Sequence, residues 1–159
     1  MRNGIEAATL LLTLPFAEAI NQACERPGHT QSPLLCYAIA WRESIEEYGS
    51  GAATVLSDNG DGGHGLFQIT EPPIPHNWQS AYVNACHAID DFITPAETFW
   101  ATFEQGEALV KCIAAEFNAG RSQALEGHEQ GDVDMKTTDD YAAAVLGFYQ
   151  HLVLTGHPV

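Results

Sequence analysis

The segment of residues 33–48 restricts the fold most strongly, because it is apolar, free of glycine and bounded by helix signals at both ends. Ser32 can accept a hydrogen bond from the first helical turn, and Pro33 suits the first helical position, where its missing N–H is not needed. Gly49 follows the segment and favours a helix end. Apolar side chains recur on one face at Leu34, Ala38, Trp41 and Ile45. The sequence therefore predicts a helix over residues 33–48 that buries one face in a core.

One carboxylate of this helix, Glu43, lies near its C-terminal end and off the apolar face. The side chains one and two turns before it are apolar or nearly so: Cys36, Ile39 and Ala40. Apolar surroundings remove solvent from a carboxyl group and raise its pKa, which suits a general acid that protonates a glycosidic oxygen. The alternative is a solvated glutamate like Glu46 and Glu47, the common environment of helical glutamates. Helical spacing alone leaves both interpretations open.

Other segments also carry helix signals. Helices are expected over residues 79–92, from a capping box at residues 94–97 onward, over residues 107–117, and from Thr137 or Thr138 to Leu154. Residues 123–136 are polar and acidic, which predicts a loop or a short helix. The chain is therefore expected to be helical along most of its length.

Four short motifs then occur in a fixed order. They are Glu43-Ser44 at the end of the first strong helix, Gly-Leu-Phe-Gln-Ile at residues 65–69, Glu-Phe-Asn-Ala-Gly at residues 116–120, and Asp140-Tyr141 opening the last helix. In this order they resemble the goose-type lysozyme and lytic transglycosylase superfamily. The pattern of that family is Glu-Ser, Gly-Leu-Met-Gln-Ile, Ala-Tyr-Asn-Ala-Gly and a tyrosine-led final helix. The resemblance extends over about residues 15–154.

The chain of 159 residues has the length of one domain and can bury a substantial core. The resemblance implies a single lysozyme-like catalytic domain over residues 1–159. Its fold would be mainly α, in the α+β lysozyme-like arrangement, with a small β element around residues 66–69 and an active-site cleft. The cleft would lie between the Glu43 helix, the loop of residues 58–64 and the turn at Asn118.

The activity implied by the resemblance is cleavage of the β-1,4 bond between N-acetylmuramic acid and N-acetylglucosamine in peptidoglycan, with Glu43 as the general acid. Gln68 would bind a substrate acetamido group or orient the acid, and Tyr141 would hydrogen-bond near Glu43. Phe117 stands where the family usually has tyrosine, so one hydroxyl is missing. The expected substrate-binding residues are Ser44, Gln68, Ile69, Phe117, Asn118 and Tyr141. No cofactor and no metal are implied. For Tyr141 an interface tyrosine, and for the Asn118 turn a simple helix cap, are the structural alternatives.

Two aspartates complete the candidate catalytic set. Asp58 and Asp61 lie in a glycine-rich loop, and by the resemblance Asp61 or Asp58 would position an attacking water. The family places another carboxylate directly after the Gln-Ile pair, where this chain has Thr70 and then Glu71. An inverting hydrolase needs two carboxyl groups, whereas a lytic transglycosylase uses the 6-hydroxyl of the sugar itself. Both aspartates can equally be turn formers that bond their own backbone. Their spacing lacks the full ligand pattern of an EF-hand, so no calcium site is predicted.

The formal net charge of −15, from 6 Lys and Arg against 21 Asp and Glu, restricts the partners. It argues against nucleic acid, whose binding needs cationic side chains, and against electrostatic capture by anionic bacterial walls. The expected partner is peptidoglycan or a related N-acetylated glycan. Chitinase-type cleavage of a neutral N-acetylglucosamine polymer is a second hypothesis. A non-catalytic glycan-binding or assembly module is a third, to which Thr70 and Phe117 lend some support. A monomer is expected.

The N-terminus and the cysteines leave alternatives open. Residues 5–23 are expected to form a helix bent at Pro15, although Arg2 and the apolar run after it also fit a short secretory signal. The expected location is secreted, periplasmic or phage-delivered to the cell wall. No apolar run has membrane-spanning length, so no membrane insertion is expected. Cys24 and Cys36 fall on successive helices and are the suspected disulfide pair, with Cys86 and Cys112 remaining; four free thiols are the alternative.

Overall fold

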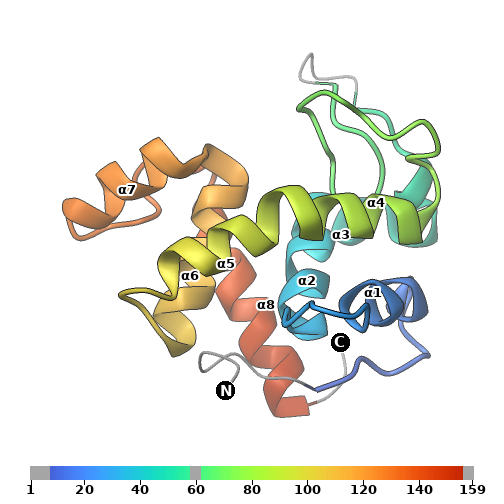
Figure 1. The fold of residues 1–159 in the computed structure, drawn as a ribbon, viewed down its shortest axis with the longest axis horizontal. Helices are drawn as coiled ribbons and strands as arrows, with labels where there is room; N and C mark the ends of the chain where they lie inside the picture. Colours follow the sequence, from blue (N-terminus) through green and yellow to red (C-terminus); the bar gives the residue numbers. More distant parts are fainter. Residues whose placement is uncertain (1–7, 58–61, 156–159) are drawn as a thin grey trace.

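The computed structural model describes residues 8–57 and 62–155 and is mainly helical, as the sequence predicts (Figure 1). The elements in chain order are α1 (Ala17–Cys24), α2 (Pro33–Ala40), η1 (Trp41–Ile45), α3 (Glu46–Tyr48), η2 (Gly49–Thr54), α4 (Ala81–Ala88), η3 (Ile89–Ile93), α5 (Thr94–Trp100), α6 (Gly106–Ala119), α7 (Arg121–Glu129) and α8 (Tyr141–Thr155). The elements η1 and η3 are π-helical turns, and η2 is a 3-10 helix. No β-sheet forms among the described residues.

Helix α8 links the two parts of the chain that matter for the site. It packs against α6 and α2, while α1 packs against α4 and α2. Figure 1 shows α8 running between α6 and α2, with α7 projecting on one side and the long connection before α4 on the other. Leu35 and Ile39 from α2, Ile113 from α6 and Val145 from α8 are fully buried in the core. This packing brings the helix that carries Glu43 beside the helix that begins at Tyr141.

The predicted helix over residues 33–48 is confirmed as one helical run made of α2, η1 and α3. The Ser32 hydroxyl accepts a hydrogen bond from the Leu35 N–H at 3.4 Å, and Gly49 ends the run with a φ of 53°. The π-helical turn interrupts the α-helical ladder at Trp41–Ile45, which sequence periodicity did not indicate. The Trp41 ring stacks on Phe148 of α8, with centroids 4.1 Å apart. The middle of the run is therefore held to α8 through an aromatic contact.

The expected N-terminal helix is wrong over residues 8–16, since α1 begins only at Ala17. Phe16 precedes it with a φ of 64°, in the left-handed region. The Asn21 side chain accepts the Leu10 N–H at 3.1 Å and donates to the Leu10 carbonyl at 3.0 Å. This pair of bonds satisfies the backbone of a buried, non-helical residue, which a helix would otherwise have done. A long-range contact therefore replaces the local helix.

The expected helix start at residues 94–97 is also wrong, because α4, η3 and α5 form one continuous helical run. Ser80 caps the run by accepting from the Val83 N–H at 3.3 Å. The Thr94 hydroxyl has no hydrogen-bond partner among the described residues. Pro95 cannot donate the next helical bond, and the π-helical turn lies immediately before it, where the ladder is already widened. The capping residues of segment 94–97 are present, but they lie inside a continuous helical run and cap no helix end.

The segment expected as a small strand forms a turn over residues 65–68 instead. Two isolated antiparallel bridges flank this turn, Leu56 with His64 and His64 with Ile69. Leu66 and Phe67 are nevertheless fully buried. These apolar side chains are therefore buried without a strand, and the backbone turns tightly because Gly65 has a φ of 70° and Gln68 a φ of 48°.

Two further boundaries differ from the expectation. Residues 121–129 form helix α7, the short-helix alternative for this polar segment. Helix α8 begins at Tyr141 and not directly after Thr137 or Thr138. Helix α6 ends at Ala119, where Gly120 has a φ of 84° and ψ of 160°, so the predicted turn at the Asn-Ala-Gly motif is confirmed.

All four cysteines are free thiols in the structure. The sulfur atoms of Cys24 and Cys36 lie 3.7 Å apart between α1 and α2. The suspected partners are therefore neighbours without a disulfide bond between them. Cys24, Cys36 and Cys112 are buried, whereas Cys86 is half-buried, and burial raises the pKa of the Cys112 thiol to about 12.

These burials predict the order of thiol modification in the native protein. An alkylating reagent at pH 8 should label Cys86 at least about ten times faster than the other three cysteines, since reaction requires an accessible thiolate. Mass spectrometry of peptides after timed labelling measures the order, and Cys86→Ser should remove the fast phase. Labelling of Cys112 as fast as that of Cys86 would contradict the burial seen here.

Candidate functional site

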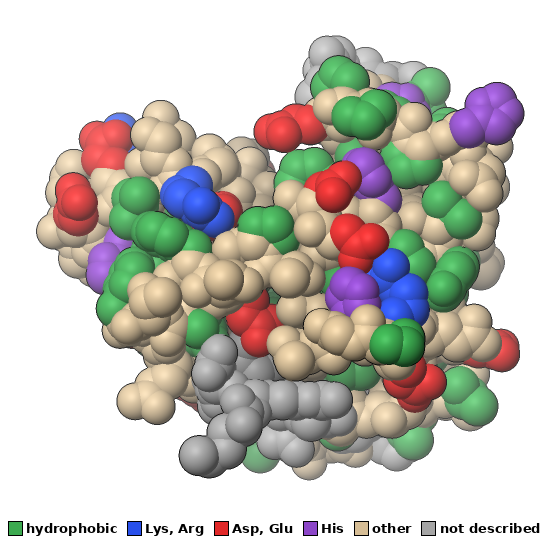
Figure 2. Space-filling view, in the orientation of Figure 1, with side chains coloured by type: hydrophobic (Ala, Val, Ile, Leu, Met, Phe, Trp, Pro, Cys, Tyr) green, Lys and Arg blue, Asp and Glu red, His purple; other side chains and the backbone are tan. Residues whose placement is uncertain are grey.

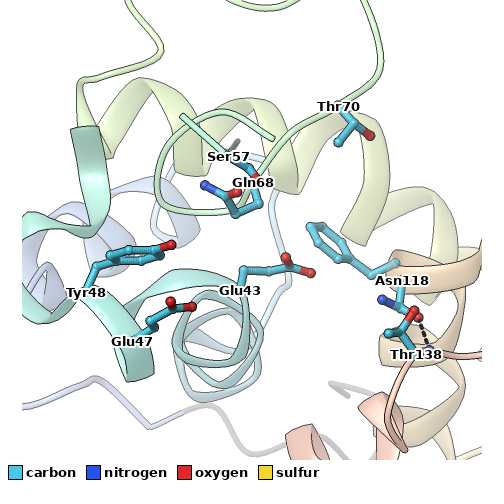
Figure 3. A pocket seen from close by; sticks show the side chains of 9 residues that line it. Glu43, Glu47, Tyr48, Ser57, Gln68, Thr70, Asn118 and Thr138 are labelled. Carbon is cyan, nitrogen blue, oxygen red and sulfur yellow. Dashed lines mark hydrogen bonds between the residues drawn. The ribbon is translucent and has the colours of Figure 1, made fainter. Parts of the chain in front are cut away.

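A cavity of about 430 Å³ opens where the Glu43 helix, the turn of residues 65–68 and the end of α6 meet. We call it the main cavity. Figure 3 shows Glu43 near its centre, with Gln68 and Thr70 on one wall and Asn118 and Thr138 on another. Its lining residues are Glu43, Glu47, Tyr48, Ser57, Gln68, Thr70, Phe117, Asn118 and Thr138. Segments far apart in the sequence thus meet around one carboxylate.

Glu43 lies inside the π-helical turn Trp41–Ile45, a local irregularity that is often found at functional sites. The Tyr141 hydroxyl donates a hydrogen bond to Glu43 Oε1 at 2.6 Å, and only 4% of the Tyr141 residue is exposed. Burial raises the pKa of Tyr141 well above its usual value, and the charge of Glu43 raises it further. The phenol therefore stays protonated and acts as a fixed donor to the carboxylate. The guanidinium of Arg42 lies 5.8 Å from the centre of the Tyr141 ring.

Ser44 does not line the main cavity. Its side chain is almost fully buried, and its hydroxyl donates to the Leu66 carbonyl at 2.6 Å. Ile69 is buried as well and faces the core. Ser44 and Ile69, two of the six expected substrate-binding residues, therefore lie behind the cavity wall. Ser44 fastens the Glu43 helix to the turn that carries Gln68.

Gln68 reaches the main cavity from a tight turn. Its Nε2 donates to the Gly65 carbonyl at 2.9 Å and to the Val55 carbonyl at 3.4 Å. A left-handed φ at a residue other than glycine costs about 1–3 kcal/mol and persists only where the surroundings impose it. These two bonds, made within the turn and to the segment before it, fix the amide at the cavity wall.

Asn84 of α4 holds the same turn from the other side, and sequence reasoning missed it. It is fully buried. Its Oδ1 accepts the Phe67 N–H at 2.8 Å, and its Nδ2 donates to the His64 carbonyl at 2.9 Å. A Cβ on Gly65 would come within 2.7 Å of Asn84 Nδ2, so glycine is required where helix and turn approach. A single asparagine within an otherwise plain helix gave no local signal of this role.

Asn118 and Phe117 form the wall contributed by α6. Asn118 Oδ1 accepts the Thr138 N–H at 2.9 Å, which leaves its Nδ2 group on the cavity side (Figure 3). The Phe117 ring contacts the rings of Phe67 and Phe92 edge-on, with centroids 6.3 and 6.0 Å away. The aromatic wall is therefore packed firmly, and it presents no hydroxyl at the position where the resembling family has one.

Asp58 and Asp61, the candidate water-positioning residues, lie outside the described residues. Thr70 does line the main cavity, at the position where the resembling family carries a carboxylate. Ser57 lines it too, and its N–H donates to the Gly63 carbonyl at 2.9 Å. The described part of the wall opposite Glu43 is thus built from hydroxyl and amide groups.

Five residues that line the main cavity were not in the expected set: Glu47, Tyr48, Ser57, Thr70 and Thr138. Glu47 follows Glu43 by four positions, and this spacing on a helix could have placed it on the same side. Tyr48 comes next and is 45% exposed, an open aromatic side chain at the edge of the cavity (Figure 3). Sequence reasoning had grouped Glu47 with the solvated glutamates at the helix end.

A second cavity of about 430 Å³ adjoins the first and shares Thr70, Phe117 and Asn118 with it. Glu116 and Arg121 form an ion pair at 2.9 Å on its wall, and Glu116 also accepts the Trp100 indole N–H at 2.8 Å. Together the two cavities make one depression with many polar lining residues. On the face shown in Figure 2, acidic side chains are scattered and Lys and Arg are few.

Two kinds of feature are absent from the described residues. Within residues 8–57 and 62–155, no group of three or more His, Cys, Asp or Glu side chains lies close enough together to hold a metal ion. Within the same ranges, no helix has the length and apolar character needed to cross a membrane.

Two comparisons with known proteins give no match. Neither a scan against protein-family models nor a search of curated proteins gives a match to this chain. The function is therefore inferred from the motifs and from the geometry of the main cavity.

Proposed function

We propose that the protein is a lysozyme-like glycosidase that cleaves the β-1,4 bond between N-acetylmuramic acid and N-acetylglucosamine in peptidoglycan. The observation that carries the proposal is the 2.6 Å hydrogen bond from Tyr141 to Glu43 at the wall of an open polar cavity. It joins residues 98 positions apart that belong to two of the four motifs. Gln68 and Asn118, from the other two motifs, line the same cavity. All four motifs of the resembling superfamily thus contribute to one place.

In the proposed reaction Glu43 is the general acid. The protonated carboxyl group gives its proton to the glycosidic oxygen, the bond from that oxygen to C1 breaks, and the sugar ring passes through an oxocarbenium-like state. The Tyr141 hydroxyl holds Oε1 of the acid and so fixes the rotation of the carboxyl group. The side-chain amides of Gln68 and Asn118 are placed to bind polar groups of the sugar, such as an acetamido group.

Two nucleophiles can complete the reaction. A water molecule gives a reducing sugar and makes the protein a lysozyme. The 6-hydroxyl of the same sugar gives an anhydro end and makes it a lytic transglycosylase, with Glu43 taking the proton of that hydroxyl as base. Thr70 offers no carboxylate at the position that the resembling family uses, which favours the second outcome. The aspartates of the loop, Asp58 and Asp61, are the candidates for the first.

A second candidate substrate is chitin, because the depression carries several carboxylates. Glu43 and Glu47 line the main cavity, and Glu71, Asp91 and Glu116 line the second one beside a single Arg121. The stem peptides of peptidoglycan bring further carboxylates, which such walls repel, whereas an N-acetylglucosamine polymer is neutral. The acid and its tyrosine would serve both substrates in the same way.

The test is mass spectrometry of soluble products from purified peptidoglycan and, in parallel, from chitin oligomers. Products with a reducing end identify hydrolysis, and products lighter by one water identify anhydro-sugar formation. Turnover of chitin oligomers with intact peptidoglycan would move the proposal to the second substrate. Binding of either glycan without turnover would contradict the enzymatic proposal and favour a glycan-binding module.

A further inference from the structure

A buried carboxylate with no part in this chemistry, that of Asp134, lies at the start of α8. Only 7% of the residue is exposed. Its Oδ1 accepts the Ala142 N–H at 2.7 Å and the Thr137 hydroxyl at 2.8 Å, and its Oδ2 accepts the Ala143 N–H at 2.9 Å. The ammonium group of Lys111 on α6 lies 3.8 Å from Oδ2. Groups from the loop, α6 and α8 therefore converge on one carboxylate.

Asp134 caps α8 from a distance. A helix usually obtains this cap from the residue directly before its first turn. Here Asp139 and Asp140, which precede the helix, both have a φ of 51°, and the acceptor comes from Asp134 instead. Its negative charge also lies at the positive end of the helix dipole. Because each carboxylate oxygen binds a different N–H, the first turn of α8 is fixed in both position and rotation.

Tyr141 is the first residue of this capped turn, next to the two N–H groups that Asp134 binds. Its hydroxyl lies at the far end of a long, rigid side chain, so a small rotation of the turn displaces the hydroxyl from Glu43 Oε1. A hydrogen bond weakens steeply once its distance and angle are lost. Asn118 binds the preceding segment at Thr138, three residues before the helix begins. The position of the Tyr141 hydroxyl therefore depends on the two N–H bonds that Asp134 accepts.

We propose that Asp134 is a positioning residue for Glu43: it holds the first turn of α8 so that the Tyr141 hydroxyl stays on the acid. The inference rests on the role proposed for Glu43. Asp134 does not line the main cavity, so its influence passes through Tyr141. Among the residues that the structure describes, Arg42 over the Tyr141 ring and Glu47 and Tyr48 in the main cavity are ionisable groups near this pair, and the variants below leave all three in place.

The experiment is a double-mutant cycle with Asp134→Asn, Tyr141→Phe and the variant that carries both changes. Asparagine keeps the shape of aspartate but offers one acceptor oxygen in place of two, so one of the two cap bonds is lost. Ser80→Ala is the matched control, because it removes the cap of α4 without reaching α8. NMR of ¹³C-labelled glutamate side chains follows the titration of Glu43, and cleavage is measured against pH alongside Tm.

Tyr141→Phe removes a donor to the carboxylate, so the titration midpoint of Glu43 should move to higher pH by on the order of one pH unit. Asp134→Asn should move it in the same direction and shift the alkaline limb of the pH–rate profile with it, because cleavage needs the protonated acid, and it should lower kcat by about 3- to 30-fold. In the variant with both changes the Asp134 substitution should add nothing further. Ser80→Ala should lower Tm and leave the Glu43 titration unchanged.

Equal effects of Asp134→Asn with and without the Tyr141 hydroxyl would overturn the proposal, as would a lower Tm with an unchanged Glu43 titration. Thr137→Val, which removes only the hydroxyl bond to Asp134, gives a milder variant if Asp134→Asn does not fold, and a smaller shift in the same direction is expected. The titration needs no substrate. A wild-type protein that cleaves no glycan would refute the proposed function while the NMR result still decides the role of Asp134.

Discussion

Replacing Glu43 by glutamine is expected to lower the rate of glycan cleavage by about 10³-fold, because the amide cannot give a proton to the glycosidic oxygen. The fold should survive, since glutamine has nearly the same shape and its amide oxygen can still accept from the Tyr141 hydroxyl. The measurement is the initial rate of release of soluble products from purified peptidoglycan, with Tm recorded for the same samples.

Glu46→Gln is the control for this substitution. This variant makes the same chemical change on the same helical run. The Glu46 side chain, however, is 49% exposed and lies 3.8 Å from Arg42. We expect its activity to stay within about twofold of the wild type, because an exposed ion pair contributes little. Retention of more than a tenth of the activity in Glu43→Gln would show that another group supplies the proton.

Replacing Asn84 by alanine is expected to destabilise the protein by about 2–4 kcal/mol. The change removes the partner of the Phe67 N–H and one of the two partners of the His64 carbonyl, which keeps the Ile69 N–H. Loss of the partner of a buried backbone group costs about 1–3 kcal/mol each, which corresponds to a fall in Tm of roughly 5–15 °C for a domain of this size. Thermal unfolding followed by circular dichroism measures the change.

The same substitution should lower cleavage below the temperature of unfolding, because Gln68 sits on the turn that Asn84 holds. Asn84→Asp keeps the acceptor for Phe67 but loses the donor to His64, so an intermediate loss is expected. Asn77→Ala removes an exposed asparagine of the same region and serves as the control, with stability unchanged within about 0.5 kcal/mol. An Asn84→Ala protein as stable as the control would show that the turn holds its own conformation.

Several residues of the candidate site could be named from the sequence alone. Gln68, Phe117 and Asn118 line the cavity that contains Glu43, and the Tyr141 hydroxyl donates to Glu43 itself. They could be named because short motifs carry a resemblance even where chain-wide comparisons find no relative. Ser44 and Ile69 belong to the same motifs but lie behind the wall, a distinction that motif order does not contain.

Residues with long-range partners escaped prediction. Asn84, Asp134 and Asn21 look alike in the sequence, as single polar side chains near helices or loops. Each binds backbone groups of another segment: Asn84 holds the turn of residues 65–68, Asp134 caps α8, and Asn21 fastens Leu10. The expected helix before Ala17 was wrong for the same reason, since a side chain eleven residues away satisfies the backbone that a helix would have satisfied.

The sequence by itself determined the helical class, the helix of residues 33–48 with its cap and its glycine stop, and the turn at Gly120. These features depend on interactions between residues a few positions apart, so the local order of side chains is enough to predict them. Only the tertiary structure decided where Glu43 points and what touches it. The buried clamp of Asn84 and the remote cap of Asp134 arise when separate segments pack, because buried backbone groups must then find partners wherever the fold brings them.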